Sequence, residues 1–144
     1  MKVEKLLVAV CGDPTDRDVL LLATALARRY GATIYATYVI EVKRSLPIDA
    51  EVGPEIDKGE QLLDMVEQCC EDAQVPVETE LLQAREVGPA IVDEAVARGV
   101  DAIFMGIPQR RRPSENELGA AVHYVLKNAP CHVWLCRAPL TTDS

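Results

Sequence analysis

The sequence predicts an α/β fold in which a doubly wound, five-stranded parallel sheet carries helices on both faces. Five short runs of aliphatic and β-branched residues alternate with four longer segments whose apolar residues recur at spacings of three and four. Such alternation indicates a parallel sheet, because parallel neighbours must be joined by right-handed helical crossovers. The first and fourth runs are almost continuously apolar, as strands covered on both faces must be. The predicted strands span residues 5–11, 33–40, 77–82, 101–106 and 131–136.

The helices expected between these strands have start and stop signals. Asp13 is a good capping residue and precedes a proline, while Asp16 places an acid in the first turn. Gly31 and Gly99 stand where the first and third helices should end, and Pro130 follows the last helix. The predicted apolar stripes are Val19, Leu22, Ala23, Leu26, Ala27 and Tyr30 in the first helix, Leu62, Leu63, Val66, Cys69, Cys70 and Ala73 in the second, Ile91, Val92, Ala95 and Val96 in the third, and Leu118, Ala121, Val122, Val125, Leu126 and Ala129 in the fourth.

Length and composition narrow the class of protein. A chain of 144 residues with 49% apolar and 26% charged side chains suits one globular domain over residues 1–144, with a polar tail from about residue 138. The net charge of −8 argues against nucleic acids and anionic membrane surfaces as partners. No apolar run approaches the roughly 20 residues of a membrane span, and no signal peptide is evident, so we expect a cytoplasmic protein without membrane insertion. The five cysteines and two histidines lack the spacing of a metal site. A chain of this size should not need disulfides, so we expect free thiols, with a redox role as the alternative.

The connection after the second predicted strand is unusually long. Residues 41–53 number 13, whereas a connection from a strand to a helix is usually short. We therefore expect either a lid over a ligand or a mobile segment.

A second loop, at residues 107–117, concentrates positive charge in an acidic chain. It follows Gly106 and leads to Gly119 at the head of the last helix, where free backbone N–H groups and the helix dipole favour an anion. An anionic ligand would seek this local field, whereas the alternative is a solvated charge run balanced by nearby glutamates. The positive residues are Arg110, Arg111 and Arg112.

The whole chain resembles the universal stress protein family. The resemblance runs from KLLVAVCGD at residues 5–13 to NAPCHVWLCR at residues 128–137 and is most specific over residues 103–137. It implies a five-stranded parallel sheet with strand order 3-2-1-4-5, in which the loops after strands one and four flank the switch point. Many members of that family bind ATP there, and many dimerise through the last strand.

The chain departs from the motif of the ATP-binding branch, which reads Gly, two residues, Gly, nine residues, Gly, then Ser or Thr. Gly106 and Gly119 fit, but Gln109 replaces the second glycine and Ala120 replaces the hydroxyl residue. Cys11 aligns with the aspartate that contacts the nucleotide in ATP binders. The resemblance therefore leaves two readings open: binding of an adenine nucleotide, or weak, altered or absent nucleotide binding.

If a nucleotide binds, the resemblance places its phosphates over the loop between strand four and the last helix. Its adenine would lie between the loop after strand one and the end of strand two. Asp13 can replace the missing carboxylate or act only as a helix cap, and Val39 and Ile40 can contact adenine or belong to the core. The candidate nucleotide-binding residues are Cys11, Gly12, Asp13, Val39, Ile40, Gly106, Gln109, Arg110, Arg111, Arg112, Ser114, Asn116, Gly119 and Ala120.

Two classes of function follow from these observations. The first is a regulatory, homodimeric module of the universal stress protein type that senses an adenine nucleotide (ATP, ADP or AMP). The second is a dimeric protein-interaction module of the same fold without a nucleotide. No catalytic residue or metal ligand is assigned, because the common hydrolase, zinc-protease and P-loop motifs are missing, and slow ATP hydrolysis is the most that we expect. The expected dimer interface comprises His132, Val133, Trp134 and Leu135, with His132 and Trp134 on one face of the strand; His123 is expected to face solvent.

Overall fold

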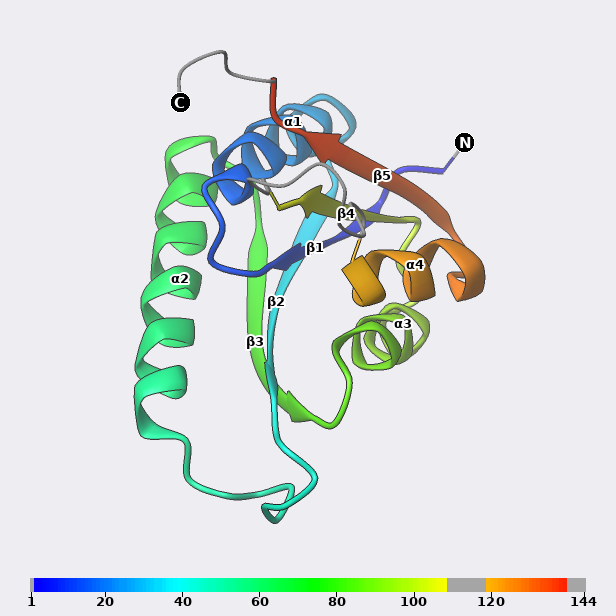
Figure 1. Ribbon diagram of the computed structural model, residues 1–144. Coiled ribbons are helices and arrows are strands. Elements are labelled where there is room, and N and C mark those ends of the chain that lie inside the picture. The colour runs from blue at the N-terminus through cyan, green and yellow to red at the C-terminus, as the bar shows by residue number, and fades with distance from the viewer. Residues whose placement is uncertain (1, 109–118, 140–144) are drawn as a thin grey trace.

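The computed structural model describes residues 2–108 and 119–139 and contains one parallel sheet of five strands in the order β3-β2-β1-β4-β5 (Figure 1). The predicted fold class and strand order are therefore confirmed. Sequential strands run outward from β1 in both directions, so the winding reverses between β1 and β4. The strands are β1 (Lys5–Val10), β2 (Thr33–Glu41), β3 (Val77–Ala84), β4 (Ala102–Ile107) and β5 (His132–Arg137).

The strand ends differ from the predicted ones for identifiable reasons. β1 stops before Cys11, because the Cys11 amide donates to the Asp16 carboxylate at 3.2 Å instead of to a neighbouring strand. β4 starts one residue late, because Asp101 accepts hydrogen bonds from the amides of Glu4 (2.8 Å) and Lys5 (3.0 Å). β3 runs on to Ala84, where its register with β2 continues to Glu41.

Four helices connect the strands and end close to the predicted signals. Asp13 does act as a cap, since its Oδ2 accepts the Thr15 amide at 2.9 Å. Gly31 (φ 69°) and Gly99 (φ 63°) end their helices in the left-handed conformation that glycine adopts without strain. The helices are α1 (Thr15–Tyr30), α2 (Gly53–Asp72), α3 (Val87–Arg98) and α4 (Gly119–Asn128).

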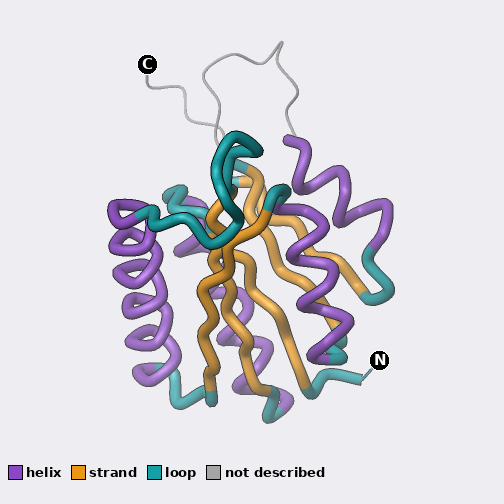
Figure 2. The backbone as a smooth tube through the Cα atoms, turned by 90° about the horizontal axis from the view of Figure 1, so that it is seen from below, coloured by secondary structure: helices purple, strands orange, loops and turns teal. Residues whose placement is uncertain are grey.

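The helices form a layer on each face of the sheet, and each layer has its own core (Figures 1 and 2). Leu6, Val8 and Val10 of β1 pack with α1 and α2, whereas Leu7 and Ala9 pack with α3 and α4. The alternation along one strand thus separates the two cores. Over residues 2–108 and 119–139, no helix is both long and apolar enough to cross a membrane.

The prediction of which side of each helix faces the sheet was partly wrong. In α1, Leu22 is 54% exposed and Tyr30 is 56% exposed, whereas Leu20 is fully buried. Leu20 and Leu22 are two positions apart and face nearly opposite directions, so only one of them can meet the sheet. Val96 of α3 (60% exposed) and Leu126 of α4 (47% exposed) also lie outside the core, while the predicted stripe residue Leu118 lies outside the described residues.

The long loop between β2 and α2 extends beyond the end of the sheet (Figure 1). The Gln83 side-chain amide donates to the carbonyls of Ile48 (3.0 Å) and Ala50 (3.1 Å). The Arg85 guanidinium donates to the Lys43 carbonyl at 2.6 Å. The end of β3 therefore anchors this loop at two points.

Candidate functional site

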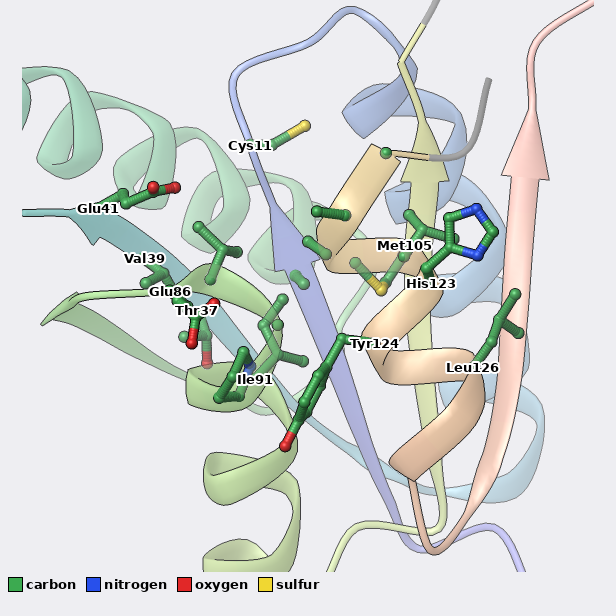
Figure 3. Close-up of a pocket in the computed structure, with 18 of the residues that line it drawn as sticks. Cys11, Thr37, Val39, Glu41, Glu86, Ile91, Met105, His123, Tyr124 and Leu126 are labelled. Carbon is green, nitrogen blue, oxygen red and sulfur yellow. The ribbon is translucent and has the colours of Figure 1, made fainter. Parts of the chain in front are cut away.

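An open cleft of about 1340 Å³ lies at the carboxyl ends of β1, β2 and β4, on the face covered by α3 and α4 (Figure 3). Its position follows from the topology, because parallel strands on either side of the switch point leave a crevice where their connections diverge. The β1 and β4 ends form its floor, the end of β2 and the start of α3 form one side, and the first turns of α4 form the other.

The cleft brings together five of the candidate binding residues. Cys11 comes from the end of β1, Val39 from β2 and Gly106 from β4, while Gly119 and Ala120 come from the head of α4. These residues come from four separate segments of the chain, which the sheet order and the position of α4 bring together.

Other candidates lie elsewhere. Ile40 is buried among the core residues under α1 and α2, because it points to the opposite face of β2 from Val39. Gly12 and Asp13 do not line the cleft; Gly12 adopts φ 87° beside Lys58, and Asp13 caps α1. The candidates Gln109, Arg110, Arg111, Arg112, Ser114 and Asn116 lie outside the described residues.

The loop after β1 is organised by Asp16, which the sequence suggested only as an acid in the first helical turn. Its buried carboxylate accepts the amides of Gly12 (2.8 Å) and Cys11 (3.2 Å). Burial raises the pKa of the Asp16 carboxyl, and the hydrogen bonds from Gly12 and Cys11 oppose this shift. Asp16 therefore fixes the direction in which Cys11 leaves the sheet.

Cys11 presents a neutral thiol to the cleft. Desolvation by the surrounding protein, followed by the nearby Asp16 carboxylate, raises the pKa of this thiol to about 11. The Sγ atom lies 3.7 Å from Asp16 Oδ1. Cys11 is therefore protonated at neutral pH and does not reproduce the negative charge of the aspartate that the family motif carries here.

The two motif glycines have different roles. A Cβ on Gly106 would lie 2.8 Å from Thr15 Cγ2, so this residue allows α1 to pack closely on β4. Gly119 has φ 76° and opens α4, whose N-terminus meets the cleft. The N–H groups and the helix dipole at a helix N-terminus favour a negatively charged ligand group.

Several cleft residues escaped the sequence analysis. Thr37, Glu41 and Glu86 line the side formed by β2 and α3, whereas His123 and Tyr124 line the side formed by α4 (Figure 3). For Thr37 and Glu41, the available signal was that they share one face of β2 with Val39. That signal becomes informative only when the strand order is known. His123 is exposed and lies at the cleft edge. No group of three or more metal-ligating side chains occurs in the part of the chain that the structure describes.

The last strand forms one edge of the sheet. His132 and Trp134 do share a face, and Trp134 is 47% exposed although it stacks on Phe104 with ring centroids 5.4 Å apart. Val133 and Leu135 are half-buried and pack against the core under α3 and α4. The exposed part of the expected dimer surface is therefore the face of β5 that carries His132 and Trp134.

Comparisons with known proteins agree with this architecture. The model of the Universal stress protein family matches residues 2–137. A universal stress protein of Methanocaldococcus jannaschii is 26% identical over 142 residues, which cover 94% of this chain and 83% of the relative. The universal stress protein of Archaeoglobus fulgidus solved with dAMP superposes with a TM-score of 0.72 at 22% identity, covering 94% of this chain and 98% of that chain. A family protein of Arabidopsis thaliana with AMP bound gives a TM-score of 0.68 at 16% identity, covering 97% of each chain. Together with the strand order and the match over nearly the whole chain, these findings establish that the protein belongs to the universal stress protein family.

Proposed function

We propose that this protein is a regulatory module that binds an adenine nucleotide (ATP, ADP or AMP) in the cleft at the switch point. The observation that carries the proposal is the cleft itself, in which Cys11, Val39, Gly106, Gly119 and Ala120 meet. The same fold holds dAMP in the Archaeoglobus fulgidus relative and AMP in the Arabidopsis thaliana relative. A cytoplasmic homodimer that responds to the nucleotide is the form of regulation that we propose.

The site also predicts that binding is weaker than a full motif would give. Ala120 provides no side-chain hydroxyl at the head of α4, and Cys11 provides no carboxylate. Each hydrogen bond to a charged group is worth about 1.5–3 kcal/mol, so two missing ones reduce the affinity substantially. The N-terminus of α4 and the arginines at residues 110–112 are the positive groups proposed to attract the phosphates.

Ligand-dependent thermal unfolding tests the proposal. ATP, ADP or AMP at millimolar concentration should raise the melting temperature, because a ligand at 100 times its Kd adds about 2.7 kcal/mol to the stability of the folded state. Val39→Trp should remove the rise, since an indole would fill the side of the cleft where adenine is expected. The same bulk at Val96, on the exposed face of α3 outside the cleft, should leave the rise intact.

Two further results complete this test. Replacing Arg110, Arg111 and Arg112 together by alanine should abolish the rise if these residues supply the countercharge. A wild-type melting temperature that no adenine nucleotide changes would contradict the proposal and would favour the protein-interaction module.

The interaction module remains the second candidate because of one surface. Trp134 exposes nearly half of a large aromatic side chain on an edge strand, and such residues are typical of protein–protein contacts. This surface serves equally for the homodimer that we propose, so the nucleotide experiment, and not the oligomeric state, separates the two candidates.

A further inference from the structure

A partly apolar surface with positive charges lies where α1 and α2 meet. The two helices cover the same face of the sheet and contact each other (Figure 1). In each helix, residues at successive spacings of four, three and four form one row, because such positions share a helix face. The rows are Arg17, Leu21, Thr24 and Arg28 of α1, and Lys58, Leu62, Met65 and Cys69 of α2. Together these two rows form what we term the α1–α2 surface.

The row on α2 is turned toward α1. A Cβ on Gly12, in the loop that leads into α1, would lie 3.0 Å from Lys58 Nζ and 3.5 Å from Leu62 Cδ1. Met65 and Cys69 continue the row, with Cys69 Sγ 3.8 Å from Met65 Sδ. Leu62, Met65 and Cys69 are half-buried against the core, so this side of α2 is largely apolar and ends in the Lys58 ammonium group.

The row on α1 lies on the side of that helix toward α2. Burial, and then the Asp18 carboxylate, raises the pKa of the Cys136 thiol in β5, which places Asp18 on the opposite side, toward β5. Leu22 and Arg29 lie four and eleven residues after Asp18 and share its side. The row on α1 is offset from these positions by one residue, a rotation of about 100° across the exposed part of the helix. It therefore approaches α2, the other neighbour of α1 on this face.

The α1–α2 surface carries three cations. Arg17, Arg28 and Lys58 are exposed, and over residues 2–108 and 119–139 none of them takes part in a salt bridge. Leu21 lies between the two arginines along α1 and is 63% exposed. Five exposed acids of α2 lie on its other flank, at spacings of three and four; they are Asp57, Glu60, Asp64, Glu67 and Glu71. A positive, partly apolar surface is thus kept apart from the acidic side of a chain whose net charge is −8.

We propose that the α1–α2 surface is a docking site for an acidic amphipathic helix of a partner protein. Such a helix binds with its apolar side against an apolar strip, and opposite charges at the borders of the strip fix its orientation. Arg17 and Arg28 are eleven residues apart, which is about 16 Å along α1, so three turns of a partner helix span them. The matching pattern has acids at its first and twelfth positions and apolar residues four and seven positions after the first acid.

Charge distribution favours this occupant over a membrane or a second copy. A short helix meets only the positive surface, since charges more than about 8–10 Å away are screened at physiological ionic strength. An extended layer of anionic lipid headgroups would also meet the acidic flank of α2, which opposes binding. In the described helices of this chain, no two acids eleven residues apart enclose apolar residues at the matching positions. A second copy therefore does not supply the partner helix.

Fluorescence anisotropy with a labelled peptide of about 15 residues tests the proposal, with glutamate at both acidic positions and leucine at both apolar positions. The peptide should bind the wild-type protein. Arg28→Glu should weaken this binding about tenfold, because it places like charges together, which corresponds to about 1.4 kcal/mol. A second peptide, with lysine in place of one glutamate, should recover most of the lost affinity for Arg28→Glu and should bind the wild type more weakly than the first peptide does.

The chain offers matched controls one residue along α1. Arg29→Glu makes the same charge change on the side toward β5, where Arg29 stacks over Tyr30 at 5.9 Å, and should leave binding of the first peptide unchanged. Leu21→Ala should weaken binding about fivefold by removing buried apolar area, whereas Leu22→Ala should not. All these positions are exposed, so the melting temperature of each variant should stay within about 2 °C of the wild type.

Three results would overturn the inference. The first is failure of the wild type to bind the peptide at about 1 mM, or equal effects of Arg28→Glu and Arg29→Glu. The second is co-sedimentation with phosphatidylserine vesicles that Arg28→Glu abolishes and Arg29→Glu preserves, which would assign the surface to a membrane. The third is self-association with the same dependence on Arg28, which would assign it to a second copy. None of these measurements uses a nucleotide, so their outcome is independent of the proposed function.

Discussion

At the scale of single residues, the loop after β1 shows how one substitution changes the chemistry of a shared fold. Cys11 places a thiol where the family motif has an aspartate. The buried Asp16 carboxylate accepts hydrogen bonds from the Cys11 and Gly12 amides. A carboxylate is therefore retained beside this loop, but it binds backbone amides of the loop and does not face the cleft. A ligand in the cleft meets a neutral sulfur, and its affinity has to come from other contacts.

This arrangement predicts that Cys11 reacts slowly although it is exposed. With a pKa of about 11, only about one thiol in a thousand is ionised at pH 8, and the thiolate is the nucleophile. Alkylation by iodoacetamide, followed by peptide mass spectrometry, should be about a hundredfold slower at Cys11 in the folded protein than in the urea-unfolded protein. Asp16→Asn should speed the reaction, because the neighbouring carboxylate contributes to the raised pKa. Equal alkylation rates in the folded and unfolded states would contradict a raised pKa of the Cys11 thiol.

At the scale of secondary-structure elements, Gly106 connects packing with the site. The missing side chain of this motif residue lets α1 approach β4. A Cβ at this position would meet both Thr15 Cγ2, at 2.8 Å, and Val19 Cγ2, at 3.3 Å. The space that a Cβ would need is occupied by α1, so the glycine is required without any nucleotide.

Gly106→Ala should therefore destabilise the ligand-free protein. Overpacking a buried contact of this kind costs about 1–3 kcal/mol, which urea denaturation would detect. Gly53→Ala is the matched control, because no atom lies within 4 Å of the added Cβ and the residue does not adopt positive φ. This control should leave the stability unchanged or raise it slightly. A Gly106→Ala protein as stable as wild type would show that α1 can shift and that the close approach is not needed.

The helices and strands also show how much of the fold and of the cleft can be predicted from the sequence. All five strands and four helices were predicted, because apolar runs and capping residues such as Asp13 act locally. The rotation of α1 was partly wrong, since spacing alone cannot decide whether Leu20 or Leu22 meets the sheet. Thr37 and Glu86 were not found, because they become neighbours of the motif glycines only through the order of the strands.

At the scale of the whole molecule, the two edges of the sheet differ in their suitability for self-association. The β3 edge carries Glu78 and Glu80, and both pair with Arg98 of α3, at 3.2 Å and 3.0 Å. Charged side chains on an edge strand oppose pairing with another chain. The β5 edge instead exposes Trp134 beside His132. A homodimer that pairs two copies through β5 is therefore the assembly that the edges favour.

Trp134→Glu should convert this proposed dimer to monomers in sedimentation velocity. A buried tryptophan at the centre of an interface typically contributes about 2 kcal/mol or more, so the dissociation constant should rise at least about thirtyfold. Substitutions at Val133 or Leu135 are less informative, because both side chains also pack in the core. Leu46→Glu is the control, since it places the same charge on an exposed leucine in the loop between β2 and α2. This variant should remain dimeric, and circular dichroism should show that both variants are folded.

Because Phe104 stacks on Trp134, Trp134→Phe should preserve the aromatic stacking and most of the dimer. This variant separates loss of the aromatic contact surface from unfolding of β5. Dimers that persist in Trp134→Glu would place the interface on another surface.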